Sequence, residues 1–483
     1  MNDSPTTSVP AADRPVTILP REWWSVAALV AIAFGLMMWV SLTMWLNGAW
    51  GLNDVGNVAN MLFNTLHGRF MWSPDHEACH FAYHFTPLLV ALSPISLLSD
   101  YPVPLVAAYV GSLAASAVPI YALARWRFAL PPLLSGAVAL LFLCNHFTAS
   151  VHLANHFESF FILGALSTMA LAYYKRPWPF WIAAVLTLAV KEDAPVWLGL
   201  WAAFEAFRPA SDFVRRRCLK LIAICILYAA VAVVTIILVS RHEGSGAESY
   251  ATRLAGFGLS VAAVSALFAL VASFAFLPLA GGRWFFLMLT PLPLTLGSFE
   301  FTRSLLYYYS YPLLPYGVLA SLAGLHRLTT SQSLPTRPVR TKQTIAALAL
   351  IIVAFVQLLL PTRTDSIRRF PWEVNADDMR RLDVLRTHPP PDAPAVVQFS
   401  LWSLLPMRPE MRTLREGNLN HPGYIVIDTR LFPGIPAAES ARIFAHLDAD
   451  VAARRRAMDN PAGTLYIFSP LASPADQETT FAR

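Results

Sequence analysis

The sequence is poor in charged residues. Asp, Glu, Lys and Arg make up 14% of its 483 residues, and hydrophobic residues make up 56%. A typical soluble domain carries about 25% charged residues, so a soluble fold of this composition could not cover its own surface. The same numbers exclude a disordered chain, and only 4 cysteines exclude a disulfide scaffold. The composition therefore predicts a multi-pass membrane protein.

Several sequence motifs are missing as well. The chain has no Gly-rich phosphate loop, no Gly-x-Ser-x-Gly turn and no Cys-x-x-Cys pair, which argues against a pump driven by nucleoside triphosphates. The net charge of +6 does not indicate nucleic acid as a partner. In a membrane protein, Lys and Arg collect on the cytoplasmic loops, and this accounts for the excess.

Long apolar runs are abundant. Residues 1–21 form a polar, Pro-rich tail without the features of a cleaved signal, so the first run should remain in the protein. A transmembrane helix needs about 20 mostly apolar residues. Eleven candidate spans follow, near 23–45, 103–124, 130–148, 157–174, 178–190, 194–207, 218–240, 254–280, 284–299, 305–326 and 343–361.

The loop charges favour a cytoplasmic N-terminus in a bacterial inner (plasma) membrane. With that orientation, most Lys and Arg before residue 361 fall in inside loops, for example Arg215, Arg216 and Arg217. Residues 48–102 then form a large first outer loop. The apolar stretch from Pro87 to Leu98 within this loop should lie at the outer face as an amphipathic or re-entrant helix, because another crossing would reverse the charge pattern.

The chain changes character after Pro361. Residues 362–483 are charged and Pro-rich, and an odd number of crossings places them outside the cell. Strand-like runs at 395–399, 424–428 and 464–468 alternate with helical stretches, the clearest from Ala437 to Met458. We therefore expect an all-α polytopic membrane domain over 22–361, followed by a small extracytoplasmic α/β domain.

Histidines and acidic residues gather in the predicted outer loops. Seven of the 12 histidines lie there: His67, His76, His80, His84, His146, His152 and His156. Acidic residues accompany them, with Lys191-Glu192-Asp193 in the next outer turn. Charged groups at the edge of the hydrocarbon are costly unless they pair or face water, so we expect a polar cavity at the outer surface. For any single histidine, the simpler interpretation is a residue of the membrane interface.

These residues also resemble a known family. The runs 54–69 (DVGNVANMLFNTLHGR), 84–87 (HFTP), 155–158 (NHFE) and 191–195 (KEDAP) are similar to domain-of-unknown-function family 2079, as are 399–406 (FSLWSLLP) and 424–428 (YIVID) in the tail. This family of bacterial and archaeal multi-pass proteins is itself similar to the GT-C superfamily of glycosyltransferases that use lipid-linked sugars. Two positions depart from the family pattern: Asn60 replaces the usual Gln, and Phe63 the usual Trp.

The resemblance implies a GT-C-like fold and mechanism. In such enzymes an acidic residue just after the first span acts on the acceptor. The sugar donor, a polyprenyl-phosphate sugar, enters the site from the membrane. Asp54 matches the position of that acidic residue. It would act as general base in an inverting transfer. Cations would stabilise the leaving phosphate, with Arg253 and Arg303 the best candidates and Arg241 a further one. The residues expected to contact substrate are His84, His156, Glu158, Lys191, Glu192, Asp193, Arg253 and Arg303.

The histidine spacing permits another interpretation. His76, His80 and His84 repeat every four residues, as do His152 and His156, and this spacing puts side chains on one face of a helix. The set His80, His84, His152 and His156 could therefore hold Zn²⁺ or another divalent metal, provided that the two loops meet.

Two rival functions remain at this stage. A lipid or solute transporter or flippase would use the same acids and histidines to bind cargo or protons. A cell-envelope assembly factor would use the tail to bind a partner, and it would tolerate the change of Asp54 to Asn.

Overall fold

The computed structural model of the chain describes residues 17–48, 53–243, 261–291, 304–305, 307–330, 339–359, 374–431, 435–461 and 463–471. Arg253 and Arg303, two of the predicted substrate contacts, lie outside these ranges. The polar tail before residue 17 also lies outside them.

Most of the described residues up to 359 are helical. The α-helices are α1 (Pro20–Leu46), α2 (Asn53–Leu66), α3 (Pro87–Leu92), α4 (Val103–Ala115), α5 (Ala117–Trp126), α6 (Pro132–Leu143), α7 (His146–Ala154), α8 (Ser159–Leu171), α9 (Pro177–Leu188), α10 (Ala194–Phe207), α11 (Asp212–Glu243), α13 (Val261–Ser273), α14 (Arg283–Leu289), α17 (Leu313–Thr330) and α18 (Val339–Leu359). Short 3₁₀ helices η1 (His80–Ala82), η2 (Ser93–Leu97) and η3 (Leu277–Gly281) connect some of them.

Fewer of these helices are long enough to cross a membrane than the sequence predicted. Among the described residues, four qualify by length and composition: Pro20–Leu46, Val103–Trp126, Asp212–His242 and Val339–Leu358. A fifth is possible if α6 and α7, bent by 48° at their junction, count as one span. The prediction of eleven crossings is therefore not confirmed. Several of the predicted runs form helices of 10–17 residues, and at about 1.5 Å per residue these are shorter than a hydrocarbon core of about 30 Å.

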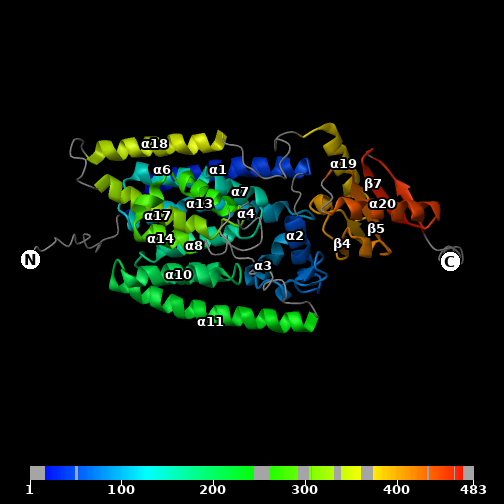
Figure 1. Ribbon diagram of the computed structural model, residues 1–483, viewed down its shortest axis with the longest axis horizontal. Helices are drawn as coiled ribbons and strands as arrows, with labels where there is room; N and C mark the ends of the chain where they lie inside the picture. Colours follow the sequence, from blue (N-terminus) through cyan, green and yellow to red (C-terminus); the bar gives the residue numbers. More distant parts are fainter. Residues whose placement is uncertain are drawn as a thin grey trace, which may run out of the picture.

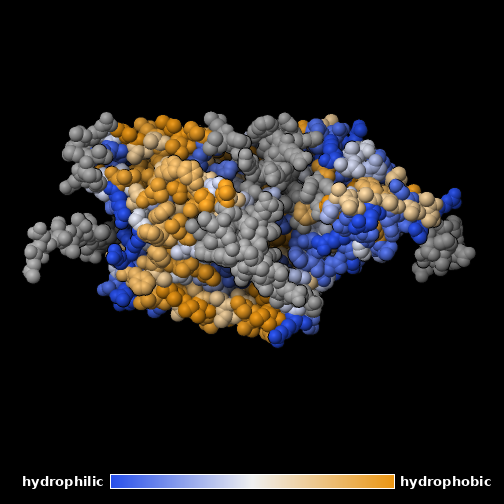
Figure 2. All heavy atoms as spheres, in the orientation of Figure 1, coloured by the Kyte–Doolittle hydropathy of each residue, from blue (hydrophilic) through white to orange (hydrophobic). Residues whose placement is uncertain are grey.

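The helices lie side by side along the long axis of the molecule (Figure 1). Helices α1 and α18 form one edge of the bundle, and α10 and α11 form the opposite edge. The outward side chains of the edge helices are apolar, for example Ile32, Ile226 and Ile352, which are all exposed. Figure 2 shows the resulting hydrophobic surface over the bundle, with hydrophilic residues gathered toward its ends. This surface is suited to contact with lipid.

Close backbone contacts hold α17 in the bundle. A Cβ atom added at Gly324 would meet the carbonyl oxygen of Leu277 in η3. One added at Gly281 would lie 2.5 Å from the carbonyl oxygen of Ala320. Small residues allow this approach, as is common where helices pack inside membranes. Helix α17 is accordingly buried along almost its whole length.

The first outer loop folds into α2, a short hairpin and two helical turns. Strand β1 (Trp72–Ser73) pairs with β2 (Ala78–Cys79), with Trp72 opposite Cys79. Residues 76–84 therefore form a hairpin arm and a 3₁₀ turn, and the predicted helical face of histidines is wrong here. Pro74 interrupts the segment and Glu77 adopts a positive φ of 51°, which a helix does not allow. Segment Pro87–Leu97 is a short apolar helix, too short to cross a membrane, as expected.

The tail forms the predicted α/β domain. Its sheet has the strand order β4-β3-β5-β7-β6, in which β3 pairs in parallel with β4 and β5, and the other pairs are antiparallel. Its elements are α19 (Ala376–Thr387), β3 (Ala395–Val397), η4 (Phe399–Leu401), β4 (Met411–Thr413), η5 (Glu416–Asn418), β5 (Tyr424–Asp428), α20 (Ala437–Ala452), β6 (Arg456–Asp459) and β7 (Leu465–Pro470).

The helix predicted from Ala437 to Met458 is six residues shorter than expected, because β6 begins at Arg456. Arg454 takes a positive φ of 54°, which turns the chain after α20. The buried guanidinium of Arg456 then donates to the carbonyl oxygens of Leu419, His421 and Gly423. These bonds fix the start of the edge strand.

The tail shares a hydrophobic core with the membrane domain. Met44 and Trp45 at the end of α1 and Val55 in α2 pack in one cluster with Leu401 and Trp402 of the tail. The indole N–H of Trp45 donates to the carbonyl oxygen of Ser403 at 2.8 Å. The amino-acid composition changes at residue 361, but the tail and the membrane domain do not have two independent hydrophobic cores.

Candidate functional site

Asp54 lies in the first turn of α2 and is half-buried. Burial raises the pKa of its carboxyl to about 6, the negative charge of Asp75 adds to the rise, and the positive charge of Lys191 opposes it. The acid is thus electrostatically coupled to both the first outer loop and the turn between α9 and α10. A carboxyl with this pKa can take up a proton near neutral pH.

Polar side chains of α2 connect this helix to the hairpin and to the tail. The side-chain oxygen of Asn57 accepts from the Ser73 hydroxyl at 3.1 Å, and from the backbone N–H of Asp75 at 3.5 Å. The side-chain oxygen of Asn60 accepts from the backbone N–H of Arg408 at 3.1 Å. Asn60, where the family usually has Gln, therefore joins α2 to the tail.

His80 is the most buried histidine of the first outer loop, with 7% of its surface exposed. Its backbone N–H donates to the Met71 carbonyl at 2.8 Å, and its ring lies 5.5 Å from the ring of His84. Burial lowers the pKa of His80 well below its usual value, and the positive charge of His84 adds to this effect. Its Nε2 has no hydrogen-bond partner among the described residues. A neutral imidazole is therefore positioned here with one nitrogen available to a ligand.

Glu192 joins the first outer loop to the turn between α9 and α10. One of its carboxylate oxygens lies 2.8 Å from Nδ1 of His84, and the other accepts from the backbone N–H of Phe85 at 3.0 Å. Burial disfavours its charge, but the charge and hydrogen bond of His84, together with Lys191, lower the pKa of Glu192 to about 2. Glu192 is therefore ionised at neutral pH and holds the two segments together.

A second chain of contacts starts at Lys191. Its ammonium group donates to one oxygen of the fully buried Glu158 at 2.8 Å, and the other Glu158 oxygen bonds to Nδ1 of His156. The His156 ring stacks on Tyr308 with centroids 4.0 Å apart. Lys191, Glu158 and His156 are thus joined by polar contacts, and Tyr308 packs against the last of them.

Asp193 completes the turn. It accepts a hydrogen bond from the hydroxyl of Tyr311, and its other carboxylate oxygen is buried without a partner among the described residues. The Lys191 ammonium lies 5.9 Å from the Tyr311 ring centroid. The tyrosines at 307–311 therefore include members of the polar cluster, although an aromatic belt was the default interpretation from sequence.

The structure brings most of the predicted site residues together. The charges of Asp54 and Lys191 interact, and hydrogen bonds link Lys191 to Glu158 and His156, and Glu192 to His84. Of the three histidines predicted in the second outer loop, His156 belongs to this cluster, as does Glu158 two residues later. Arg241 lies exposed near the end of α11.

The four-histidine metal site is not formed. His152 bonds through Nε2 to the Ser41 hydroxyl and the Met37 carbonyl of α1, both at 3.0 Å. Asn155, with a left-handed φ of 48°, ends α7 and turns His156 away from the helix that carries His152. In the ranges that the structure describes, no three His, Cys, Asp or Glu side chains form a group that could hold a metal ion.

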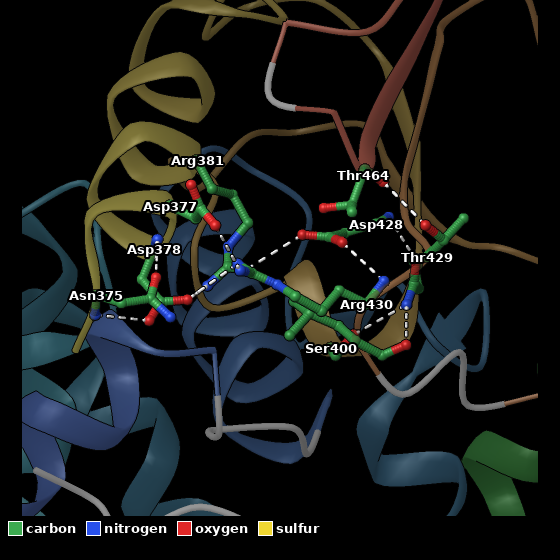
Figure 3. Close-up of polar contacts among 11 residues, drawn as sticks. Asn375, Asp377, Asp378, Arg381, Ser400, Asp428, Thr429, Arg430 and Thr464 are labelled. Carbon is green, nitrogen blue, oxygen red and sulfur yellow. Dashed lines mark hydrogen bonds and ion pairs between the residues drawn. The ribbon is translucent and has the colours of Figure 1, made fainter. Parts of the chain in front are cut away.

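A second polar cluster lies in the tail, and sequence reasoning missed it (Figure 3). The guanidinium of Arg381, 1% exposed, contacts Asp378 at 2.9 Å and Asp428 at 3.1 Å. Arg430 also contacts Asp378, at 3.0 Å. The sequence did contain one sign of this cluster: Asp378 and Arg381 are three residues apart, a spacing that allows an ion pair on one face of a helix.

This network faces the end of α1. A Cβ atom added at Gly48, which has a φ of +73°, would lie 3.3 Å from a guanidinium nitrogen of Arg381. Both carboxylates that contact Arg381 are almost completely buried. The cluster therefore fixes the tail to the first helix, and we assign it a structural role.

Comparison with known proteins gives one result for the chain as a whole. A family model described as predicted membrane protein (DUF2079) matches residues 53–434, which includes α2, the polar cluster and most of the tail. No curated protein matches the chain. The match covers well over half of the sequence, and the chain therefore belongs to the DUF2079 family of predicted membrane proteins.

Proposed function

We propose that the protein transfers a sugar from a polyprenyl-phosphate carrier to an acceptor hydroxyl at the outer face of the membrane, with Asp54 as general base. The observation that carries the proposal is the placement of Asp54 in the first turn of α2, where burial and the charge of Asp75 raise the pKa of its carboxyl to about 6 and the charge of Lys191 opposes the rise. The proposed reaction type follows from the resemblance of the sequence to family 2079, which is itself similar to the GT-C superfamily.

The reaction is a single displacement. The acceptor oxygen attacks the anomeric carbon, the bond from that carbon to the phosphate oxygen breaks, and Asp54 takes the hydroxyl proton. The electron pair of the broken bond stays on the polyprenyl phosphate, which leaves with an additional negative charge. Inversion at the anomeric carbon follows.

The leaving phosphate needs hydrogen-bond donors. Lys191 is a cation held beside Glu158, and Nε2 of His80 has no partner in the part of the chain that the structure describes. In the proposal these two groups stabilise the developing charge, together with Arg253 and Arg303. Glu192 and His84 act as positioning residues, since they tie the first outer loop to the Lys191 turn.

The test is a transfer assay with purified full-length protein, synthetic polyprenyl-phosphate sugars and a panel of acceptors. We expect Asp54→Asn to lower turnover by at least about a hundredfold, because it removes general-base catalysis. Glu77→Gln is the matched control, since Glu77 lies in the same loop but pairs only at the surface with Arg412. Equal turnover of wild type and Asp54→Asn would overturn the proposal.

A transporter is the second candidate, and the buried path from Lys191 through Glu158 to His156 favours it. Such a path could carry protons coupled to movement of a cargo. The same assay distinguishes the two functions, because transfer creates a glycosylated acceptor of increased mass and transport creates no new covalent bond.

A further inference from the structure

An apolar groove lies on the bundle between α17, η3 and α18. Its volume is about 500 Å³, which is within the range of pockets that bind small molecules. Leu277 of η3, Leu325 and Leu328 of α17, and Ile345 and Leu350 of α18 line it. Nearly the entire wall is therefore hydrocarbon.

One end of the groove is positively charged. Lys342, in the first turn of α18, lines the groove beside Thr329, at the end of α17. Arg327 lies on the same last turn of α17 and reaches the Ala280 carbonyl at 3.4 Å. This end of α18 points away from the tail domain (Figure 1). Apolar walls and a cationic end are thus combined in one groove.

The position of the groove identifies the medium around it. Helix α18 is a candidate membrane span, and two apolar side chains that line the groove, Ile345 and Leu328, are themselves exposed. A groove on this surface opens toward lipid chains. The charge at its end lies where the apolar span begins, which is the level of lipid headgroups.

We propose that this groove binds an anionic phospholipid, with one acyl chain along α17 and α18 and the phosphate group beside Lys342. The apolar wall accounts for the chain and the cations account for the charge of the headgroup. The proposal does not depend on Asp54 or on sugar transfer, because the groove is formed by other helices.

Native mass spectrometry of the full-length protein, exchanged into equal mixtures of phosphatidylglycerol and phosphatidylcholine, tests the proposal. We expect wild type to retain phosphatidylglycerol preferentially. Lys342→Gln should reduce that preference about fivefold, the effect of one cation near a headgroup, and Lys342→Arg should keep it. Ala346→Phe, which fills the groove, should reduce the retention of both lipids.

Leu348→Phe is the matched control for groove filling, since Leu348 faces outward on the same helix and does not line the groove. It should retain lipid as wild type does. Equal retention of both lipids by wild type, or an unchanged preference in Lys342→Gln, would overturn the proposal. Loss of retention in Leu348→Phe equal to that in Ala346→Phe would do the same.

Discussion

At the scale of single residues, the environment of Asp54 is the most informative. Its carboxyl is half-buried and faces the charge of Asp75, and both effects favour the protonated form. The general base of the proposed reaction must be deprotonated. Activity should therefore be low below pH 6 and high above it.

The pH profile of transfer gives the first prediction. We expect kcat/KM of wild type to fall about tenfold per pH unit below an apparent pKa of about 6. Asp75→Asn removes a negative charge that raises the pKa of Asp54, so the falling limb should shift to lower pH while activity at pH 8 is kept. Asp75 also contacts Thr413 and Arg415, so a thermal melt must accompany the profile. If the falling limb of the pH profile does not shift in a folded Asp75→Asn variant, the assignment of Asp54 as the general base is contradicted.

The buried ion network gives the second prediction. Arg381→Met leaves the carboxylates of Asp378 and Asp428 buried with less compensation, and this should lower the free energy of unfolding by about 3–5 kcal/mol. Arg386→Met on the same helix is the control. Arg386 pairs with Asp383 at the surface, where such a pair contributes at most about 1 kcal/mol. Equal melting temperatures of the two variants in detergent would contradict the structural role of the network.

The sequence indicated the members of the site better than their arrangement. Asp54, Glu158 and Lys191 were recognised because charges at the edge of apolar runs are costly. The separation of His152 from His156 was not foreseeable, since it depends on the left-handed backbone of Asn155. The network around Arg381 joins residues about 50 positions apart, and a single sequence does not show such pairs.

At the scale of elements, composition predicted where helices form and overestimated how many cross a membrane. Runs such as 178–190 and 194–207 do contain helices, α9 and α10, but these have 12 and 14 residues. Apolar composition alone does not distinguish a lipid-facing span from a short helix buried among neighbours. The tail strands were recognised because short runs rich in β-branched and aromatic residues, separated by helical stretches, favour strands.

Packing of α17 against η3 gives the third prediction. Gly324→Ala places a methyl group against the Leu277 carbonyl, and backbone must move to accommodate it. Overpacking of this kind costs about 1–3 kcal/mol, so the melting temperature should fall by several degrees. Gly136→Ala in α6 is the control, because no atom lies within 4 Å of its added Cβ. A variant of Gly324 as stable as that control would show that the contact is looser than described.

At the scale of the whole molecule, the tail domain lies at one end of the bundle, and the start of α11 lies at the other (Figure 1). A membrane around the apolar band would place these ends on opposite sides. The loop charges predict the tail outside the cell and the start of α11 inside.

Cysteine labelling gives the fourth prediction. In a background with Cys79→Ser, Glu416→Cys in the tail should react with a membrane-impermeant maleimide on intact spheroplasts, whereas Arg216→Cys should react only after permeabilisation. Both positions are exposed, and the other three cysteines are buried. Labelling of Arg216→Cys alone on intact spheroplasts would mean that the orientation is reversed.

The contact between Trp45 and the tail has a consequence for biosynthesis. The indole emerges from the ribosome several hundred residues before Ser403 and Trp402, which cover it in the finished protein. Until translation reaches that point, Met44 and Trp45 at the end of α1 and Val55 in α2 lack the tail residues that cover them in the folded protein. We therefore expect the tail to dock onto α1 and α2 late in synthesis, and rapid translation of the tail would shorten the time for which these apolar side chains stay exposed.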